Sequence, residues 1–124
     1  MSHLHAQGWI HHDIKPDNIL CSYEEGRYVF FLTDYSLATR HDESLEAGEH
    51  PSHAYTAPEV THAHTCGCPE DVYSLGKTLL RLAPESAAST VLGVLALMSN
   101  DNLVLRPSAH HAADLLRNAA RPQS

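Results

Sequence analysis

Residues 10–20 constrain the fold of this chain more than any other segment, because they combine loop character with a cluster of reactive side chains. Pro16 has no backbone N–H and blocks regular pairing in the middle of the segment. The segment is therefore predicted to be a loop that the rest of the fold must hold in place. The reactive side chains in this loop are Asp13, Lys15 and Asn18.

Residue patterns predict the elements that follow this loop. β-Rich runs at 18–23 and 28–33 flank the turn residues 24–27, which is typical of a hairpin. Cys21 is expected to be buried in it. The polar stretch 34–58 is long for a connection inside a compact domain, so it is predicted to be either functional or mobile.

Helices are predicted to dominate the remainder of the chain. Pro69 is followed by acidic residues, which suits the first turn of a helix, and leucines then recur at helical spacing. Serines before the later apolar stretches suit helix N-caps. The predicted helices cover about residues 69–82, 86–99 and 108–120. The expected fold class is mainly α with a small β-hairpin.

Size and charge exclude several classes of protein. The chain has 124 residues and 43% apolar content, enough for one domain with a core. A net charge of −7 argues against general nucleic-acid binding, which needs a basic face. No stretch of about 18 apolar residues predicts a membrane span, and the first residues lack the features of a signal peptide. The cytoplasm or the nucleus is the expected location.

The residue types in the two loops indicate phosphoryl transfer. Asp34 begins a second loop directly after the predicted hairpin. A base, a cation and two oxygen ligands suit this reaction, because its main demands are positioning and neutralisation of phosphate charge. Magnesium prefers few carboxylates together with substrate phosphates. Asp34 and Asn18 are therefore the predicted magnesium ligands.

Short motifs along the chain resemble those of the eukaryotic-type protein kinase family. The matching segments are 11–18 (H-R-D-x-K-x-x-N), 34–36 (D-F-G), 57–59 (A-P-E), 71–76 (D-V-W-S-x-G) and 106–109 (R-P-S/T-A). One such match would be weak, but several in the family's order make chance a poor explanation. The resemblance implies that residues 1–124 are part of a Ser/Thr-type kinase domain, its large C-terminal lobe. Residues 10–20 would be the catalytic loop and 34–59 the activation segment.

The resemblance implies roles in transfer of phosphate from ATP to a protein hydroxyl. Asp13 would accept the proton of the substrate hydroxyl, and Lys15 would steady the transferring phosphate. Asn18 and Asp34 would hold Mg²⁺. Ser52 falls where the family has the threonine that lines the substrate site.

Other residues would have structural roles in the resembled fold. His11 and Tyr35 would stack against one another, and Asp71 would hold the backbone of the catalytic loop. Glu59 would pair with Arg106, and breaking a buried pair of this kind typically costs about 3–5 kcal/mol.

The chain also departs from the family pattern. His12 replaces the arginine that usually receives an activation-loop phosphate, and Ser36 replaces a glycine at the magnesium loop. A single helix is predicted between residues 82 and 106, where the family places two.

No Gly-rich loop or strand lysine precedes residues 10–20, so the small lobe is expected to be absent. The isolated chain is then expected to bind ATP and Mg²⁺ weakly or not at all and to be inactive on its own, and its small-lobe-facing surface could mediate self-association.

Two functions from different classes remain open. The first is a Ser/Thr protein kinase acting on a protein substrate, which the presence of Asp13, Lys15, Asn18 and Asp34 favours. The second is a catalytically inactive pseudokinase fragment that serves as a scaffold for a partner protein, which His12 and the missing small lobe favour. Binding of ATP with Mg²⁺ distinguishes the two.

A metal site of another kind is a further alternative. The candidate ligands are His62, His64, Cys66 and Cys68. These residue types suit zinc, but their alternating spacing is not that of common zinc fingers, and an exposed loop is the favoured interpretation. His5 is expected to be solvated.

Overall fold

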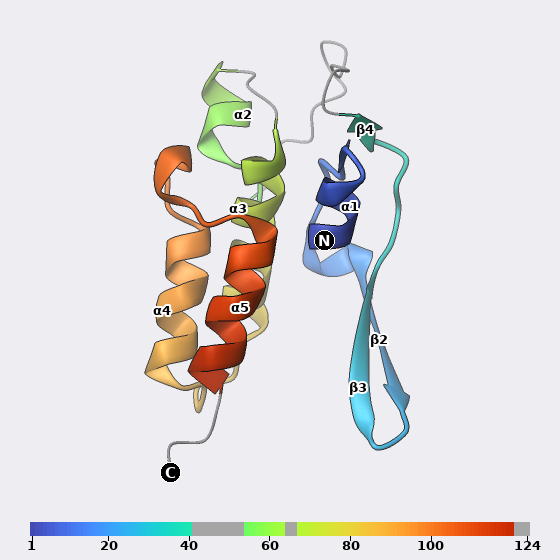
Figure 1. Ribbon diagram of the computed structural model, residues 1–124, viewed down its shortest axis with the longest axis vertical. Coiled ribbons are helices and arrows are strands. Elements are labelled where there is room, and N and C mark those ends of the chain that lie inside the picture. The colour runs from blue at the N-terminus through green and yellow to red at the C-terminus, as the bar shows by residue number, and fades with distance from the viewer. Residues whose placement is uncertain (41–53, 64–66, 121–124) are drawn as a thin grey trace.

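The computed structural model describes residues 1–40, 54–63 and 67–120 of the chain (Figure 1). The N-terminal elements are α1 (Ser2–Ala6), β1 (Trp9–Ile10), the 3₁₀ helix η1 (Pro16–Asn18), β2 (Ile19–Glu24), β3 (Arg27–Leu32) and β4 (Thr39–Arg40). The C-terminal elements are α2 (Pro58–Ala63), α3 (Cys68–Leu82), α4 (Ser89–Met98), the 3₁₀ helix η2 (Leu103–Leu105) and α5 (Ala109–Ala120). None of the helices in the described ranges has the length and apolar content that crossing a membrane requires.

Helices α3, α4 and α5 pack together and form the main hydrophobic core (Figure 1). The buried cluster contains Val72 from α3, Leu95 and Met98 from α4, and Ala109 and Ala112 from α5. Burying a large aliphatic side chain contributes about 1.5–3 kcal/mol, so this cluster is the chief source of stability for the helices. It also gives α3 a rigid position from which its N-terminal half can support the loop at residues 10–20.

Close approach of α3 and α4 depends on Gly76. A Cβ atom at this position would lie 2.9 Å from the Cβ of Met98 and 3.0 Å from the carbonyl oxygen of Leu95. Backbone and Cβ atoms cannot easily move aside, so any side chain at residue 76 would push the helices apart. Gly93 of α4 is different, because nothing lies within 4 Å of the position its Cβ would take.

The hairpin of β2 and β3 is confirmed and extends away from the helices in Figure 1. The strands are antiparallel, with Ile19 opposite Leu32 and Glu24 opposite Arg27. Glu25 and Gly26 form the turn with φ angles of 50° and 81°, as a tight two-residue hairpin turn requires. The expectation that Cys21 is buried is wrong. Its side chain is exposed, since the described residues leave that face of the hairpin uncovered.

The observed elements make the described part of the chain about half helical with small antiparallel sheets, which is less helical than the mainly α prediction but has the predicted mixture of helices and a hairpin. Helices α3 and α5 lie at about 69–82 and 108–120, where helices are predicted. Helix α4 begins at Ser89 rather than at residue 86. The reason is a turn in the preceding residues, in which the N–H of Ala87 donates to the carbonyl of Pro84 at 3.0 Å.

We expect the two helical glycines to respond in opposite ways to alanine. Gly76→Ala should lower the free energy of unfolding by about 1–3 kcal/mol, because the added methyl group overlaps α4. Gly93→Ala should raise it by up to about 1 kcal/mol, because alanine favours an exposed helical position. Urea denaturation of both variants measures the difference. Equal stability of the two variants would show that the packing of α3 on α4 is described incorrectly.

Candidate active site

The carboxylate of Asp71 holds the backbone of the loop that carries the candidate site. Asp71 lies in the first turn of α3 and is fully buried, at 0% exposure. Its two oxygens accept hydrogen bonds from the backbone N–H groups of His11 at 2.7 Å and His12 at 3.0 Å. The Nε2 atom of His5 also lies 2.9 Å from this carboxylate. The expectation that His5 is solvated is therefore wrong, and its side chain is only 10% exposed.

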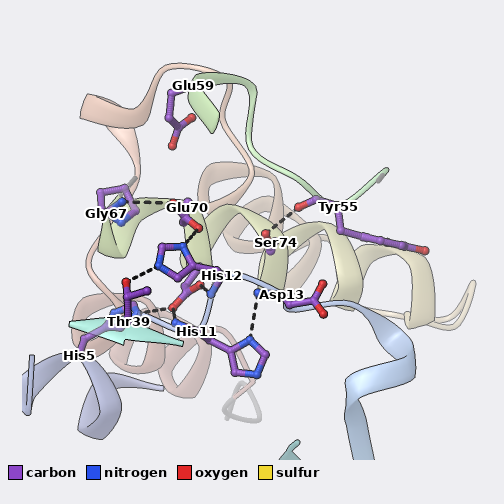
Figure 2. A network of polar contacts seen from close by, with 12 residues as sticks. His5, His11, His12, Asp13, Thr39, Tyr55, Glu59, Gly67, Glu70 and Ser74 are labelled. Atoms are coloured by element: carbon purple, nitrogen blue, oxygen red, sulfur yellow. Dashed lines mark hydrogen bonds and ion pairs between the residues drawn. The ribbon is translucent and has the colours of Figure 1, made fainter. Parts of the chain in front are cut away.

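His12 forms a second set of contacts between the loop and its surroundings (Figure 2). Its Nδ1 donates to Oε1 of Glu70 at 2.5 Å, and its Nε2 lies 2.7 Å from the hydroxyl oxygen of Thr39. Glu70 also accepts from the N–H of Gly67 at 3.2 Å, at the start of α3. One buried imidazole thus links the loop to both α3 and β4. Sequence reasoning did not identify Glu70 or Thr39, although an acidic residue beside Asp71 was a usable signal.

The backbone at His12 is strained. Its φ of 73° lies in the left-handed region, which costs a residue other than glycine about 1–3 kcal/mol unless its surroundings hold it there. The backbone bond to Asp71 and the ring contacts with Glu70 and Thr39 provide that support. The loop is therefore held in one conformation by buried polar contacts on both its backbone and its side chains.

His11 connects the loop to the end of the hairpin. Its ring is buried, and Nδ1 accepts a hydrogen bond from the N–H of Asp13 at 3.1 Å. Its Nε2 donates to the carbonyl of Thr33 at 2.9 Å, just after β3. The ring of Tyr35 lies edge-on to His11, with 5.1 Å between the ring centroids. The residues of the expected stacking pair are therefore in contact.

The structure brings Asp13 and Asn18 together. Both are almost buried, at 8% and 7% exposure. The amide nitrogen of Asn18 donates to the backbone carbonyl of Asp13 at 2.8 Å and to its carboxylate Oδ2 at 3.2 Å. Thr33 in turn donates to the carbonyl of Asn18 from its N–H at 2.8 Å. These contacts position the Asp13 carboxylate and leave the amide oxygen of Asn18 as the atom that could bind a cation.

Asp34 lies on the exposed surface directly after the hairpin, with a φ of 58°. Its Oδ1 accepts from the Ser36 hydroxyl at 2.6 Å and from the Ser36 N–H at 3.3 Å. These hydrogen bonds, helped by the more distant charges of His11 and Lys15, lower the pKa of the Asp34 carboxyl group. Asp34 is consequently an anion at neutral pH. Ser36, which occupies a position where glycine is usual, acts as its hydrogen-bond partner.

An ion pair between Glu59 and Arg106 joins α2 to the segment before α5. The guanidinium group donates to both carboxylate oxygens of Glu59, at 2.6 and 2.7 Å. Its Nε donates to the carbonyl of Asn100 at 2.7 Å, and its centre lies 4.8 Å from the centroid of the Tyr73 ring. The Arg106 side chain has 0% exposure. The two residues expected to pair are thus paired, and every face of the guanidinium group is in contact with protein.

Known proteins share sequence similarity with this chain. A family model described as "Protein kinase domain" matches residues 1–92. The chain belongs to the eukaryotic-type protein kinase family. It is 34% identical over 92 residues to the mitosis inhibitor protein kinase mik1 of Schizosaccharomyces pombe, which covers 74% of this chain and 15% of the relative. It is 36% identical over 88 residues to the serine/threonine-protein kinase ksp1 of the same organism, covering 66% of this chain and 18% of the relative.

A third relative shares a shorter segment with the chain. The calcium/calmodulin-dependent protein kinase type 1 of Macrobrachium nipponense is 30% identical over 76 residues, which covers 61% of this chain and 22% of that protein. The chain therefore spans between 15% and 22% of the length of these curated relatives. The range matched by the family model, residues 1–92, includes residues 10–20.

Some predicted site residues lie outside the described residues. Ser52 is one of them, and so are His64 and Cys66 of the candidate zinc set. Within the described parts of the chain, no three His, Cys, Asp or Glu side chains come together in a way that could hold a metal ion. The zinc alternative therefore stays untested.

Asn18 and Asp34 each offer an oxygen donor of the kind that magnesium takes. Magnesium is a hard cation that takes oxygen ligands, and it commonly uses one or two carboxylates and completes its shell with water and substrate phosphates. Asp34 is an exposed anion whose Oδ2 receives neither of the Ser36 hydrogen bonds, and the Asn18 amide oxygen is oriented away from its own donor contacts.

We expect Arg106→Ala to destabilise the fold by about 3–5 kcal/mol, because the buried Glu59 carboxylate would lose its charge partner. Arg117→Ala is the matched control. Arg117 lies 3.4 Å from Asp114 in an exposed pair on α5, and such pairs contribute about 0–1 kcal/mol. Thermal and urea unfolding of both variants measures the contrast. Losses of similar size would show that the Glu59 pair is not a structural contact.

Proposed function

We propose that this chain contributes the catalytic-loop part of a Ser/Thr protein kinase, which in the complete enzyme transfers phosphate from ATP to a protein hydroxyl. The observation that carries the proposal is the contact of the Asn18 amide with both the carbonyl and the carboxylate of Asp13. This contact places a carboxylate next to a potential metal ligand. The backbone of the loop that carries both is held by Asp71. Preorganisation of this kind suits a reaction that depends on positioning and charge.

In this proposal Asp13 accepts the proton of the attacking hydroxyl group. Its side chain is nearly buried and is oriented by Asn18, so little rearrangement is needed before it can act. Lys15 follows two residues later and is partly exposed, which leaves its ammonium group able to approach a phosphate. Its charge would stabilise the negative charge that develops on the transferred group.

Asn18 and Asp34 would hold Mg²⁺ through their side-chain oxygens. The bound ion would neutralise phosphate charge and so favour binding of ATP. The lowered pKa of Asp34 keeps its carboxylate charged across the physiological pH range, as a metal ligand requires.

The same proposal assigns the chain to the large, C-terminal lobe of the kinase fold. Residues 10–20 are then the catalytic loop, and residues 34–59 are the activation segment, in which Ser52 would line the substrate site. Glu59 and Arg106 would secure the end of that segment to the helices.

A scaffold without catalytic activity is the second candidate function. His12 already contacts Glu70 and Thr39 from a buried position, which leaves it unable to bind an activation-loop phosphate without breaking these contacts. Large apolar side chains are also exposed near the site, with Phe30 at 67% and Tyr35 at 52%. Apolar surface of this kind can bind a partner protein or a second copy of the chain.

NMR titration with ATP and Mg²⁺ decides between the two candidates, because it detects binding even at millimolar affinity. For a kinase site, we expect the backbone amide signals of Asn18 and Asp34 to shift on addition of both ligands. Asp34→Asn should abolish the magnesium-dependent part of the shift.

Asp114→Asn on α5 is the control, since it removes one carboxylate elsewhere and should leave the titration unchanged. No shift at millimolar ATP and Mg²⁺ would contradict a nucleotide site in this chain alone and favour the scaffold.

A further inference from the structure

A cavity with two basic side chains opens beside the proposed catalytic loop. Its volume is about 390 Å³, and its lining residues are Lys15, Pro16, Asp17, Tyr55, Arg81 and Leu82. Lys15 is two residues from Asp13, so the cavity lies next to the place where a substrate hydroxyl would be bound. Tyr55 belongs to the proposed activation segment, and Arg81 belongs to the last turn of α3.

The cations in this cavity have no ion-pair partner among the described residues. Arginines that do form ion pairs in the described residues do not line this cavity. Arg106 pairs with Glu59, and Arg117 pairs with Asp114. The charge of Lys15 has the smallest effect among the causes that lower the pKa of Asp34. Asp17 also lines the cavity, so its charged side chains sum to +1, whereas the chain as a whole carries a net charge of −7.

The walls of the cavity are suited to a side chain with a short apolar stem. Tyr55, Leu82 and Pro16 supply apolar surface between the charged groups. The backbone of Tyr55 is fixed, because its carbonyl accepts a hydrogen bond from the Ser74 hydroxyl at 2.6 Å, and in Figure 2 its side chain extends away from the contact between His12 and Glu70. A methylene stem could lie against these walls while an anionic group reaches the guanidinium of Arg81.

We propose that Arg81 selects an anionic side chain close to the acceptor hydroxyl of a peptide substrate. The proposal rests on the proposed kinase function and adds a substrate class to it. The anion is a carboxylate of Asp or Glu or the phosphate of a modified residue, since both match a guanidinium group in charge and geometry. Arg81 is a specificity-determining residue in this account and has no part in the chemical step.

Binding of fluorescent peptides, followed by anisotropy without ATP or Mg²⁺, tests this site directly. The peptides share a central serine and differ at the flanking positions, which carry Glu, phosphoserine, Gln or Lys. We expect the Glu peptide to bind about three- to ten-fold more tightly than the Gln peptide, and the Lys peptide to bind most weakly. The phosphoserine peptide shows which anion is preferred.

Variants at residue 81 separate charge recognition from a general loss of structure. Arg81→Gln should remove the preference for Glu over Gln, Arg81→Lys should keep most of it, and Arg81→Glu should favour the Lys peptide. Arg117→Gln, at an exposed position on α5, should leave all affinities unchanged. Circular dichroism checks that each variant is folded.

Equal binding of the Glu and Gln peptides, absence of binding by any peptide, or a preference that survives Arg81→Gln would each overturn the proposal. These outcomes are distinct from failure of the kinase function, because the assay needs neither nucleotide nor metal and Asp34→Asn should not affect it. Selective binding of the acidic peptides without any response to ATP and Mg²⁺ would support the site and reject catalysis.

Discussion

The buried carboxylate of Asp71 is the interaction on which the candidate site depends. It accepts hydrogen bonds from two consecutive backbone N–H groups, those of His11 and His12, which lie 60 and 59 residues earlier in the chain. An unpaired charge at 0% exposure would be strongly destabilising, so the loop and α3 require one another. The same contact supports the left-handed backbone of His12, and from there the chain turns toward Asp13.

Helix α3 can provide this support because its own position is fixed at several points. Gly76 allows it to lie close to α4, and Arg106 donates to the carbonyl of Pro69 at 3.1 Å near its start. Glu70 links its first turn to His12, and Ser74 links its middle to Tyr55. One rigid helix thus positions the loop on one side and the end of the 34–59 segment on the other. The chemistry proposed for the site follows from that shared support.

Local patterns in the sequence predict much of this structure, while contacts between distant residues are harder to predict. The hairpin follows from alternating β-formers around a turn, and α3 follows from Pro69, its acidic neighbours and the leucine spacing. The pairing of Glu59 with Arg106 and the contact of His11 with Tyr35 were expected only through the family resemblance. Periodicity alone does not specify which side chains meet over such separations.

Three side chains differ from what the sequence predicts, because their surroundings depend on residues far away in the sequence. The local sequence predicts a solvated His5, yet the fold places it beside a carboxylate 66 residues away. The resemblance implies that His12 is a poor substitute for an arginine in binding phosphate. In the structure its buried imidazole instead contacts Glu70 and Thr39. The position of Cys21 in a predicted strand favours a buried side chain, but within the described residues that face of the hairpin has no cover.

Amide hydrogen exchange in Asp71→Asn tests the central role of this carboxylate most directly. An asparagine has one acceptor oxygen in place of two and carries no charge. If Asp71 holds the loop, the amides of His11 and His12 should be strongly protected in the unmodified chain. In the variant they should exchange much faster, while amides in the middle of α4 remain protected. Unchanged protection of His11 and His12 in a folded Asp71→Asn variant would contradict the account.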